Sequence, residues 1–303
     1  MNTDRFINLF AAVALVELML TIGLGAKVKE VLAVARDWRG LIRACFANYV
    51  VVPAATVGLL LAFNVQPMVA AGFMVVAVCP GAPFSPPFTA VAKGDVSRAI
   101  GLMVLLAGSS ALLAPLLLRL LLPTVTGAGA GVLLNVDAVR IASTLCLVQF
   151  LPLCVGLAIS AYRPALAARW RAPAGRLGTI LNLALLAFVI AVQSRMLSAI
   201  RVRGYFGMFL LLAVSGAAGW VLGGRAPSER SALAITTAVR NVGVALVIAG
   251  GTFPGTPAVT ATTAYGLFQT LAALAAVLAV ARRGAAKAAR GEIAPGPVVP
   301  QHT

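Results

Sequence analysis

Two charged side chains lie inside otherwise apolar stretches of this sequence. Glu17 falls in ALVELMLTIGLG and Arg240 in ITTAVRNVGVALVIA. An arginine at membrane depth costs about 3 kcal/mol on insertion scales, so such groups usually face a cavity or a partner. Glu17 is therefore a proton-coupling group, a partner for Arg240, or a residue tilted to the outer interface. Arg240 is a tethered cation that hydrogen-bonds backbone carbonyls, a ligand for the carboxylate or sulfate of an organic anion, or the partner of Glu17.

Arg240 lies in one of two apolar segments that cannot be continuous helices. Residues 78–89, VCPGAPFSPPFT, carry four prolines and a glycine, and residues 231–250 are interrupted by a polar cluster. Proline lacks the backbone donor and clashes with the preceding helical turn. Broken helices are tolerated in a membrane only where the freed backbone faces protein or water. A broken segment in each half of the chain is typical of inverted-repeat transporters, whose binding site lies where the two breaks cross.

Polar residues in and around the two breaks are the candidates for lining that site. They are Ser85, Thr89, Thr236, Thr237, Arg240, Asn241 and Asn48. Gln149 and Gln269 either face the same cavity or form hydrogen bonds between helices.

Composition places all of these residues in a polytopic membrane protein. The 303 residues are 61% hydrophobic and 11% charged, far from the balance of a soluble domain. The apolar runs are about 20 residues long, so helices are favoured over barrel strands. Nine segments are predicted, at residues 6–26, 39–63, 68–93, 96–122, 138–162, 177–199, 204–224, 231–250 and 256–281. They form one all-α domain, 1–281, with repeats at about 1–125 and 135–281.

The net charge of +16 is explained by topology, because basic residues collect in cytoplasmic loops. With nine spans the basic loops share one side, which predicts an outside N-terminus and a cytoplasmic, disordered tail at 282–303. The exception is a basic cluster of Arg195, Arg201 and Arg203. The sequence has no basic stripe interleaved with aromatic residues, so a nucleic-acid partner is not predicted. The only histidine is His302 and the four cysteines form no CxxC pair, so neither an enzyme nor a metal centre is predicted.

Four motifs, in order along the chain, resemble the bile acid:sodium symporter family. CPGAPFSPPFTAVAKGDV is similar to the family's CPGG-x-x-SN…AKGDV motif, and ITTAVRNVGVALVIA to its second crossing motif. TIGLGAKVKEV resembles the end of the family's first span, and NYVVVP its QF-x-x-MP stretch. The resemblance covers residues 10–282. It implies a core bundle and a panel bundle with two broken helices crossing between them, in a nine-helix form at the bacterial-type inner membrane.

The resemblance also implies positions for two sodium ions, and most of those positions are altered. They are Ser85, Pro86, Ala99, Met103, Thr236, Arg240 and Asn48. Ser85 has the same residue type as the family's ligand at that position. Thr236 stands where the family has a shared glutamate, and Arg240 where it has a glutamine. Sodium needs several oxygen ligands, in the manner of other hard cations. A guanidinium 4–5 Å away would oppose it by about 3–4 kcal/mol at an effective dielectric of about 20.

The sequence therefore predicts a secondary transporter that moves small amphipathic organic anions by alternating access, without two-sodium coupling and without a cofactor. The alternative is a sodium-coupled organic anion symporter with rearranged ligands. The expected partners are an organic anion and the lipid bilayer, and no oligomeric state is predicted.

Overall fold

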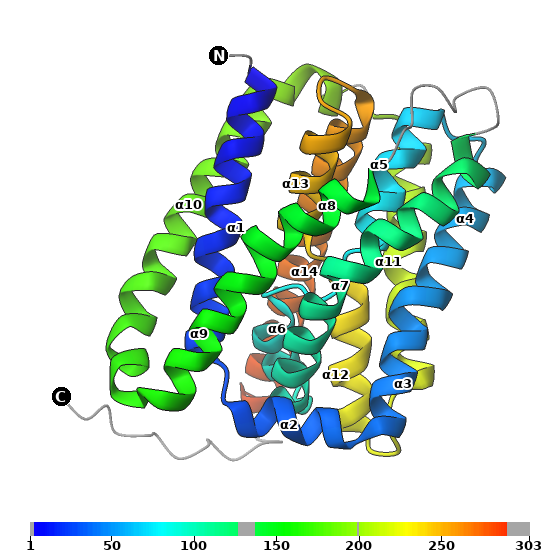
Figure 1. Ribbon diagram of the computed structural model, residues 1–303. Helices are drawn as coiled ribbons and strands as arrows, with labels where there is room; N and C mark the ends of the chain where they lie inside the picture. The colour runs from blue at the N-terminus through cyan, green and yellow to red at the C-terminus, as the bar shows by residue number, and fades with distance from the viewer. Residues whose placement is uncertain (1–2, 127–136, 199, 290–303) are drawn as a thin grey trace.

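A computed structural model describes residues 3–126, 137–198 and 200–289, and every regular element in these ranges is helical. Figure 1 shows the long helices running side by side between two ends of the molecule. The α-helices are α1 (Thr3–Gly25), α2 (Val28–Arg36), α3 (Trp38–Phe46), α4 (Val52–Ala62), α5 (Pro67–Ala77), α6 (Ser85–Val91), α7 (Val96–Thr126), α8 (Ala138–Leu145), α9 (Leu151–Tyr162), α10 (Pro164–Ser198), α11 (Val202–Leu222), α12 (Pro227–Ala238), α13 (Val242–Thr252) and α14 (Pro257–Ala289).

Each of the nine predicted apolar segments corresponds to one helix or to two successive helices. The prediction of an all-helical protein is confirmed for the described residues. Helices are favoured because lipid offers no hydrogen bonds and a helix pairs its backbone groups internally. The count of nine membrane spans is not confirmed. In the described residues five helical segments are long and apolar enough to cross a bilayer, or six if α1 and α2 count as one bent span. The 11 residues of α5 reach only about 16 Å, about half of a hydrocarbon core.

Three helices extend into regions that were expected to be loop or tail. Residues 28–36 form α2, which is bent by 85° from α1 and lies across one end of the molecule (Figure 1). α10 begins at Pro164 and includes three of the four arginines of the expected loop, Arg169, Arg171 and Arg176, whose exposed side chains remain in water. α14 continues to Ala289, so the first eight residues of the predicted tail are helical. Residues 290–303 lie outside the described residues.

Two π-helical turns hold buried amide side chains in the middle of spans. Ala47–Val51 forms η1 between α3 and α4, and Cys146–Phe150 forms η3 between α8 and α9. A proline, Pro53 or Pro152, follows each turn at the same spacing. Its missing N–H removes an ordinary helical hydrogen bond, and the helix accommodates this with one wide turn. Asn48 and Gln149, on these two turns, are fully buried.

The helices pack in two groups, in agreement with the expected panel and core bundles. The panel consists of α1, α9 and α10, where α1 contacts both other helices. Gly23 and Gly156 allow α1 and α9 to touch, since a Cβ on Gly23 would lie 2.5 Å from the carbonyl oxygen of Leu153. The core is built from α4–α7 and α11–α14, and α2 and α3 connect it to the panel.

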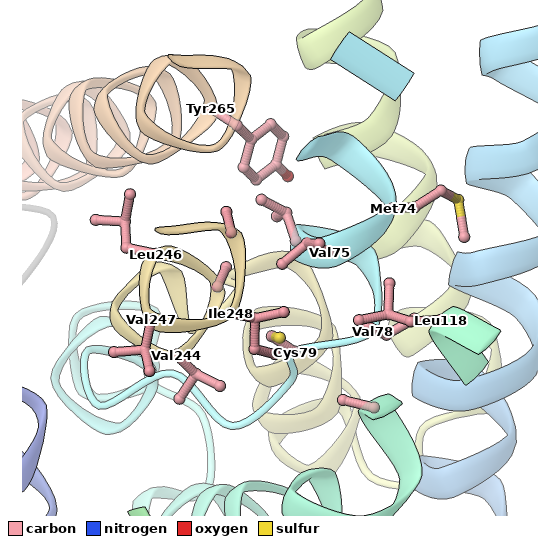
Figure 2. Packing of buried hydrophobic residues seen from close by; sticks show 14 of the residues in the cluster. Met74, Val75, Val78, Cys79, Leu118, Val244, Leu246, Val247, Ile248 and Tyr265 are labelled. Carbon is pink, nitrogen blue, oxygen red and sulfur yellow. The ribbon is translucent and has the colours of Figure 1, made fainter. Parts of the chain in front are cut away.

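The core is held by apolar side chains on both sides of the two breaks. Figure 2 shows Val78 and Cys79 from the first break beside side chains of α5, α7, α13 and α14. Tyr265 packs edge-on against Phe73, with ring centroids 6.2 Å apart. Burial of these side chains fixes the ends of the half-helices, which must be rigid to hold a site.

Candidate functional site

The first break separates α5 from α6 at residues 78–84. Pro80 and Pro83 prevent helical pairing, and Gly81 turns the chain with a φ of 80°. A Cβ on Gly81 would lie 2.5 Å from the backbone nitrogen of Ala107 on α7. Only glycine meets both demands, because a positive φ is strained for other residues and the space is closed. The predicted interruption is therefore present, and its carbonyl groups are free to bind other segments.

The second break separates α12 from α13 at Val239–Asn241, and it is bonded directly to the first. The backbone nitrogen of Asn241 donates to the carbonyl oxygen of Cys79 at 2.9 Å, and its side-chain amide donates to Gly81 O at 3.3 Å. The same side chain caps α13 by accepting from the nitrogen of Val244. The two broken helices thus cross inside the core, as the paired interruptions predict.

Arg240 projects from this crossing into the interior and is 1% exposed. Its Nη1 donates to Oδ1 of Asn48 at 2.8 Å. Asn48 in turn donates to the hydroxyl of Thr237 at 3.1 Å, which links η1 to α12. Nε and Nη2 of Arg240 are buried without a hydrogen-bond partner. The crossing therefore holds a fixed positive charge with only one neutral acceptor for its guanidinium.

Gln269 on α14 holds the backbone of Arg240. Its side-chain oxygen accepts from Arg240 N at 3.0 Å, and its side-chain nitrogen donates to Arg240 O at 2.8 Å. An amide side chain thus replaces the helical partners that the break removes. The two sequence-based alternatives for Gln269 both hold, because it also lines the cavity described next.

A cavity of about 360 Å³ lies between the panel and the crossing. Its crossing side includes Arg240, Asn241 and Gln269, and its panel side includes Glu17 of α1 and Asn182 of α10. Apolar side chains cover most of the remaining wall. Apolar walls with a few polar groups at fixed positions are typical of small-molecule sites.

Glu17 lies in the wall of this cavity. One carboxylate oxygen accepts from the hydroxyl of Thr21 at 2.7 Å, and the other is buried without a partner. Across the residues that the structure describes, the ion pairs within 4 Å are those of Arg98 with Asp37 and with Glu229. A direct pair between Glu17 and Arg240, one of the sequence-based alternatives, is therefore not formed.

The remaining predicted site residues are buried near the breaks but are bonded within their own segments. Ser85 donates to Ala82 O, Thr89 to Ser85 O at 2.8 Å and Thr236 to Ala232 O at 2.7 Å. Of the other altered sodium positions, Pro86 lies in the first turn of α6, and Ala99 and Met103 are buried on α7. These last three supply no side-chain oxygen.

Charged residues join the ends of the two broken helices that lie away from the crossing. Arg98, at the start of α7, binds Asp37 at 2.8 Å and lies 3.7 Å from Glu229 on α12. The backbone nitrogen of Asp95 also donates to Ser228 O at 3.0 Å. The N–H of Gly40, which Asp37 caps at the start of α3, and then Arg98 lower the pKa of the Asp37 carboxyl below its ordinary value. We call Asp37, Arg98 and Glu229 the charge clamp.

Several cavity residues carry no signal in the sequence that would have found them. Thr21, Thr179 and Asn182 line the panel side, and Gly178 lies against Glu17. They become neighbours only because α1 packs on α10. Tyr265, which lies one turn before Gln269, has a buried hydroxyl without a partner and was also not predicted.

The comparison with protein families agrees with this geometry. The sequence model of the Sodium Bile acid symporter family matches residues 12–201, more than half of the chain. A search of the curated proteins finds no match. The chain therefore belongs to the sodium bile acid symporter family, whose members are membrane transporters of small molecules and not enzymes. The match includes residues 12–25 of α1 and the whole first broken helix, and it ends before α12 and α13.

Proposed function

We propose that the protein carries small amphipathic organic anions across the inner membrane of a bacterial-type cell by alternating access, without two-sodium coupling and without a cofactor. The observation that carries the proposal is the buried guanidinium of Arg240 at the crossing of the broken helices, where it binds Asn48 at 2.8 Å. The apolar cavity beside it supports an amphipathic substrate.

The fixed charge argues against a bound sodium ion at the crossing. Arginine remains protonated in proteins, so its positive charge is permanent. An additional cation 4–5 Å away would be opposed by about 3–4 kcal/mol, enough to weaken its binding by two to three orders of magnitude, roughly. Pro86, Ala99 and Met103 offer no compensating side-chain oxygen.

The same charge favours an anion in the cavity. Helix α13 begins at Val242, which also lines the cavity. Helix N-termini attract negative charge, so this end of α13 favours an anion. A carboxylate or sulfate would lie toward Arg240 and α13, while an apolar body would contact side chains such as Leu183, Leu246 and Leu267.

The test is uptake into proteoliposomes that contain the purified protein, with radiolabelled taurocholate as the probe. Equal saturable uptake with sodium, potassium or choline outside is expected. Uptake that requires sodium with a Hill coefficient near two would contradict the proposed coupling and favour the sodium-coupled alternative.

Arg240→Gln tests whether the guanidinium contributes to anion binding. Taurocholate affinity, measured by thermal shift, is expected to fall at least about tenfold, because the charge is lost while a side-chain amide remains. Arg119→Gln, which removes an exposed arginine from α7, is the matched control and should leave the affinity unchanged. Equal affinities for wild type and Arg240→Gln would assign Arg240 to structure alone.

We also propose that the N-terminus is outside and the C-terminus in the cytoplasm. The corners that carry most basic residues, at α2, at α9–α10 and at α11–α12, lie at the end of the molecule opposite the start of α1 (Figure 1). Arg203, an exception to this pattern, donates to Phe63 O at 2.8 Å and lies over the Phe63 ring. A fusion of green fluorescent protein to the C-terminus should fluoresce. An active alkaline phosphatase fusion at the C-terminus would contradict the proposed orientation.

A further inference from the structure

The carboxyl group of Glu17 is partly buried between α1 and α10 and has one oxygen without a hydrogen-bond partner. Its second carboxylate oxygen is buried, has no hydrogen-bond donor, and faces α10 at Gly178. A Cβ at Gly178 would lie 2.1 Å from that oxygen. The glycine therefore leaves the space that the carboxyl group occupies. α1 and α10 lie side by side along this contact (Figure 1).

No basic side chain in the described residues neutralises this carboxyl group within 4 Å. α13, which packs directly on α1, carries no titratable or charged residue. The titratable or charged residues on the other elements around α1, with described side chains, are Asp137 and Arg140 at α8, Cys146 on η3, Cys154 and Tyr162 on α9, and Arg169, Arg171 and Arg176 on α10. Among these residues, Arg171 lies beside Gly25, two turns from Glu17. Arg240, from the crossing, is the cation that lines the same cavity as Glu17.

Charge balance in this cavity links a proton to the substrate. With the cavity empty, an ionised Glu17 offsets the permanent charge of Arg240. When an organic anion enters, it offsets Arg240 itself, and an ionised Glu17 would then be an unbalanced negative charge in an apolar site. Protonation of Glu17 removes that repulsion, so each event favours the other.

We propose that Glu17 binds one proton together with each transported anion, which makes the protein a proton-coupled symporter. This inference rests on the proposed function. The proton comes from the solution on the loading side and binds the free carboxylate oxygen of Glu17. It returns to solution on the other side when the anion leaves. Thr21 holds the other oxygen, and its hydroxyl can donate to either form of the carboxyl group.

The test measures proton uptake when taurocholate binds to the detergent-solubilised protein in weak buffer with a pH-sensitive dye. The taurocholate sulfonate stays ionised, so any proton taken up binds to the protein. Wild type should take up about one proton per bound anion over the pH range in which anion binding protonates Glu17, and over that same range its affinity should fall by up to about tenfold per pH unit. Glu17→Gln should bind taurocholate without proton uptake and with no dependence on pH. Binding to wild type without proton uptake would overturn the inference.

Two glycine variants separate the carboxyl group from general packing. Gly178→Ala displaces the Glu17 carboxyl group and should change the pH dependence of binding. Gly175→Ala, one turn earlier on the same cavity wall, meets only Thr21 Cγ2 at 3.9 Å and should keep it. Equal pH profiles for the two variants would mean that the proton binds elsewhere.

A measurement without substrate distinguishes failure of this inference from failure of the proposed function. Infrared difference spectra between wild type and Glu17→Gln report the carbonyl stretch of a protonated carboxyl group. This band should appear as the pH is lowered over the range used for the binding measurement. A band that is constant over the range, present or absent, overturns proton coupling. If wild type transports no taurocholate in any salt, the proposed function fails, and the spectra still decide whether Glu17 titrates.

Discussion

The two breaks in the crossing helices differ in length and in chemical cause. The first, between α5 and α6, is imposed by the backbone, through Pro80, Pro83 and the positive φ of Gly81. The second, between α12 and α13, contains neither proline nor glycine at Val239–Asn241. Its backbone groups are satisfied by the side chain of Gln269 and by the carbonyl of Cys79.

This difference implies an order of dependence. The first break would persist without the second, because its own residues cannot continue a helix. The second has residues that could form a helix and is held open by hydrogen bonds to α14 and to the first break. Substitutions at the first break should therefore affect the whole core, and substitutions at the second should affect mainly α12, α13 and the cavity.

Gly81→Ala should have the largest effect. The new Cβ would lie 2.5 Å from Ala107 N and force an alanine to a φ of 80°, which we expect to destabilise the protein by about 4 kcal/mol. Thermal unfolding in detergent measures this. Gly243→Ala, whose Cβ would meet Asn241 Oδ1 at 3.5 Å, is the matched control and should unfold near the wild-type temperature. Similar decreases in unfolding temperature for the two variants would contradict the conclusion that the core depends on the first break.

Gln269→Leu should rank second. It leaves the backbone N–H of Arg240 buried without a partner, while Arg240 O keeps only the N–H of Val242 at 3.0 Å, at a cost of about 2–3 kcal/mol. Thr270→Val is the control, because Thr270 bonds only within its own helix. Hydrogen exchange should locate the loss in α12 and α13, while α5 and α6 remain protected. Uniform loss of protection would contradict the proposed order of dependence.

Asn241→Ala should cost less, about 1–2 kcal/mol, because it removes the cap of α13 and the bond to Gly81 O. Asn241→Ser keeps a capping oxygen, so it should recover most of the lost stability. If serine is no better than alanine, the contact with the first break is the larger contribution.

The charge clamp should give the smallest effect, below about 1 kcal/mol, because the Asp37 side chain is 39% exposed. The folded-state pKa of Asp37 is lowered, so its contribution is complete above the ordinary carboxyl pKa of about 4 and is lost as the pH falls through the lower folded value. Unfolding temperatures of wild type and Asp37→Asn should therefore differ at neutral pH and converge in acid. A gap that grows in acid would contradict this sign.

The sequence predicts the helical segments and the first break well, because apolar length and proline act locally. It also indicates Arg240, Asn241 and Asn48, whose polarity is conspicuous in apolar runs, and these residues meet at the crossing. Ser85, Thr89 and Thr236 look equally conspicuous, yet their hydroxyls bond within their own segments. The π-helical turns and, apart from Glu17, the panel side of the cavity were not predicted. They depend on a shift of register at proline and on the packing of α1 against α10, which have no local pattern.

One guanidinium and one carboxyl group in the wall of a single cavity have an electrical consequence. If Glu17 is protonated only when a monovalent anion is bound, the loaded site and the empty site both sum to zero. Neither half of the cycle then moves net charge, although a field of 100 mV is worth about 2.3 kcal/mol for each charge that crosses it. Uptake would follow concentration and acidity alone, whereas a carrier that takes two sodium ions with one anion also draws on the membrane voltage.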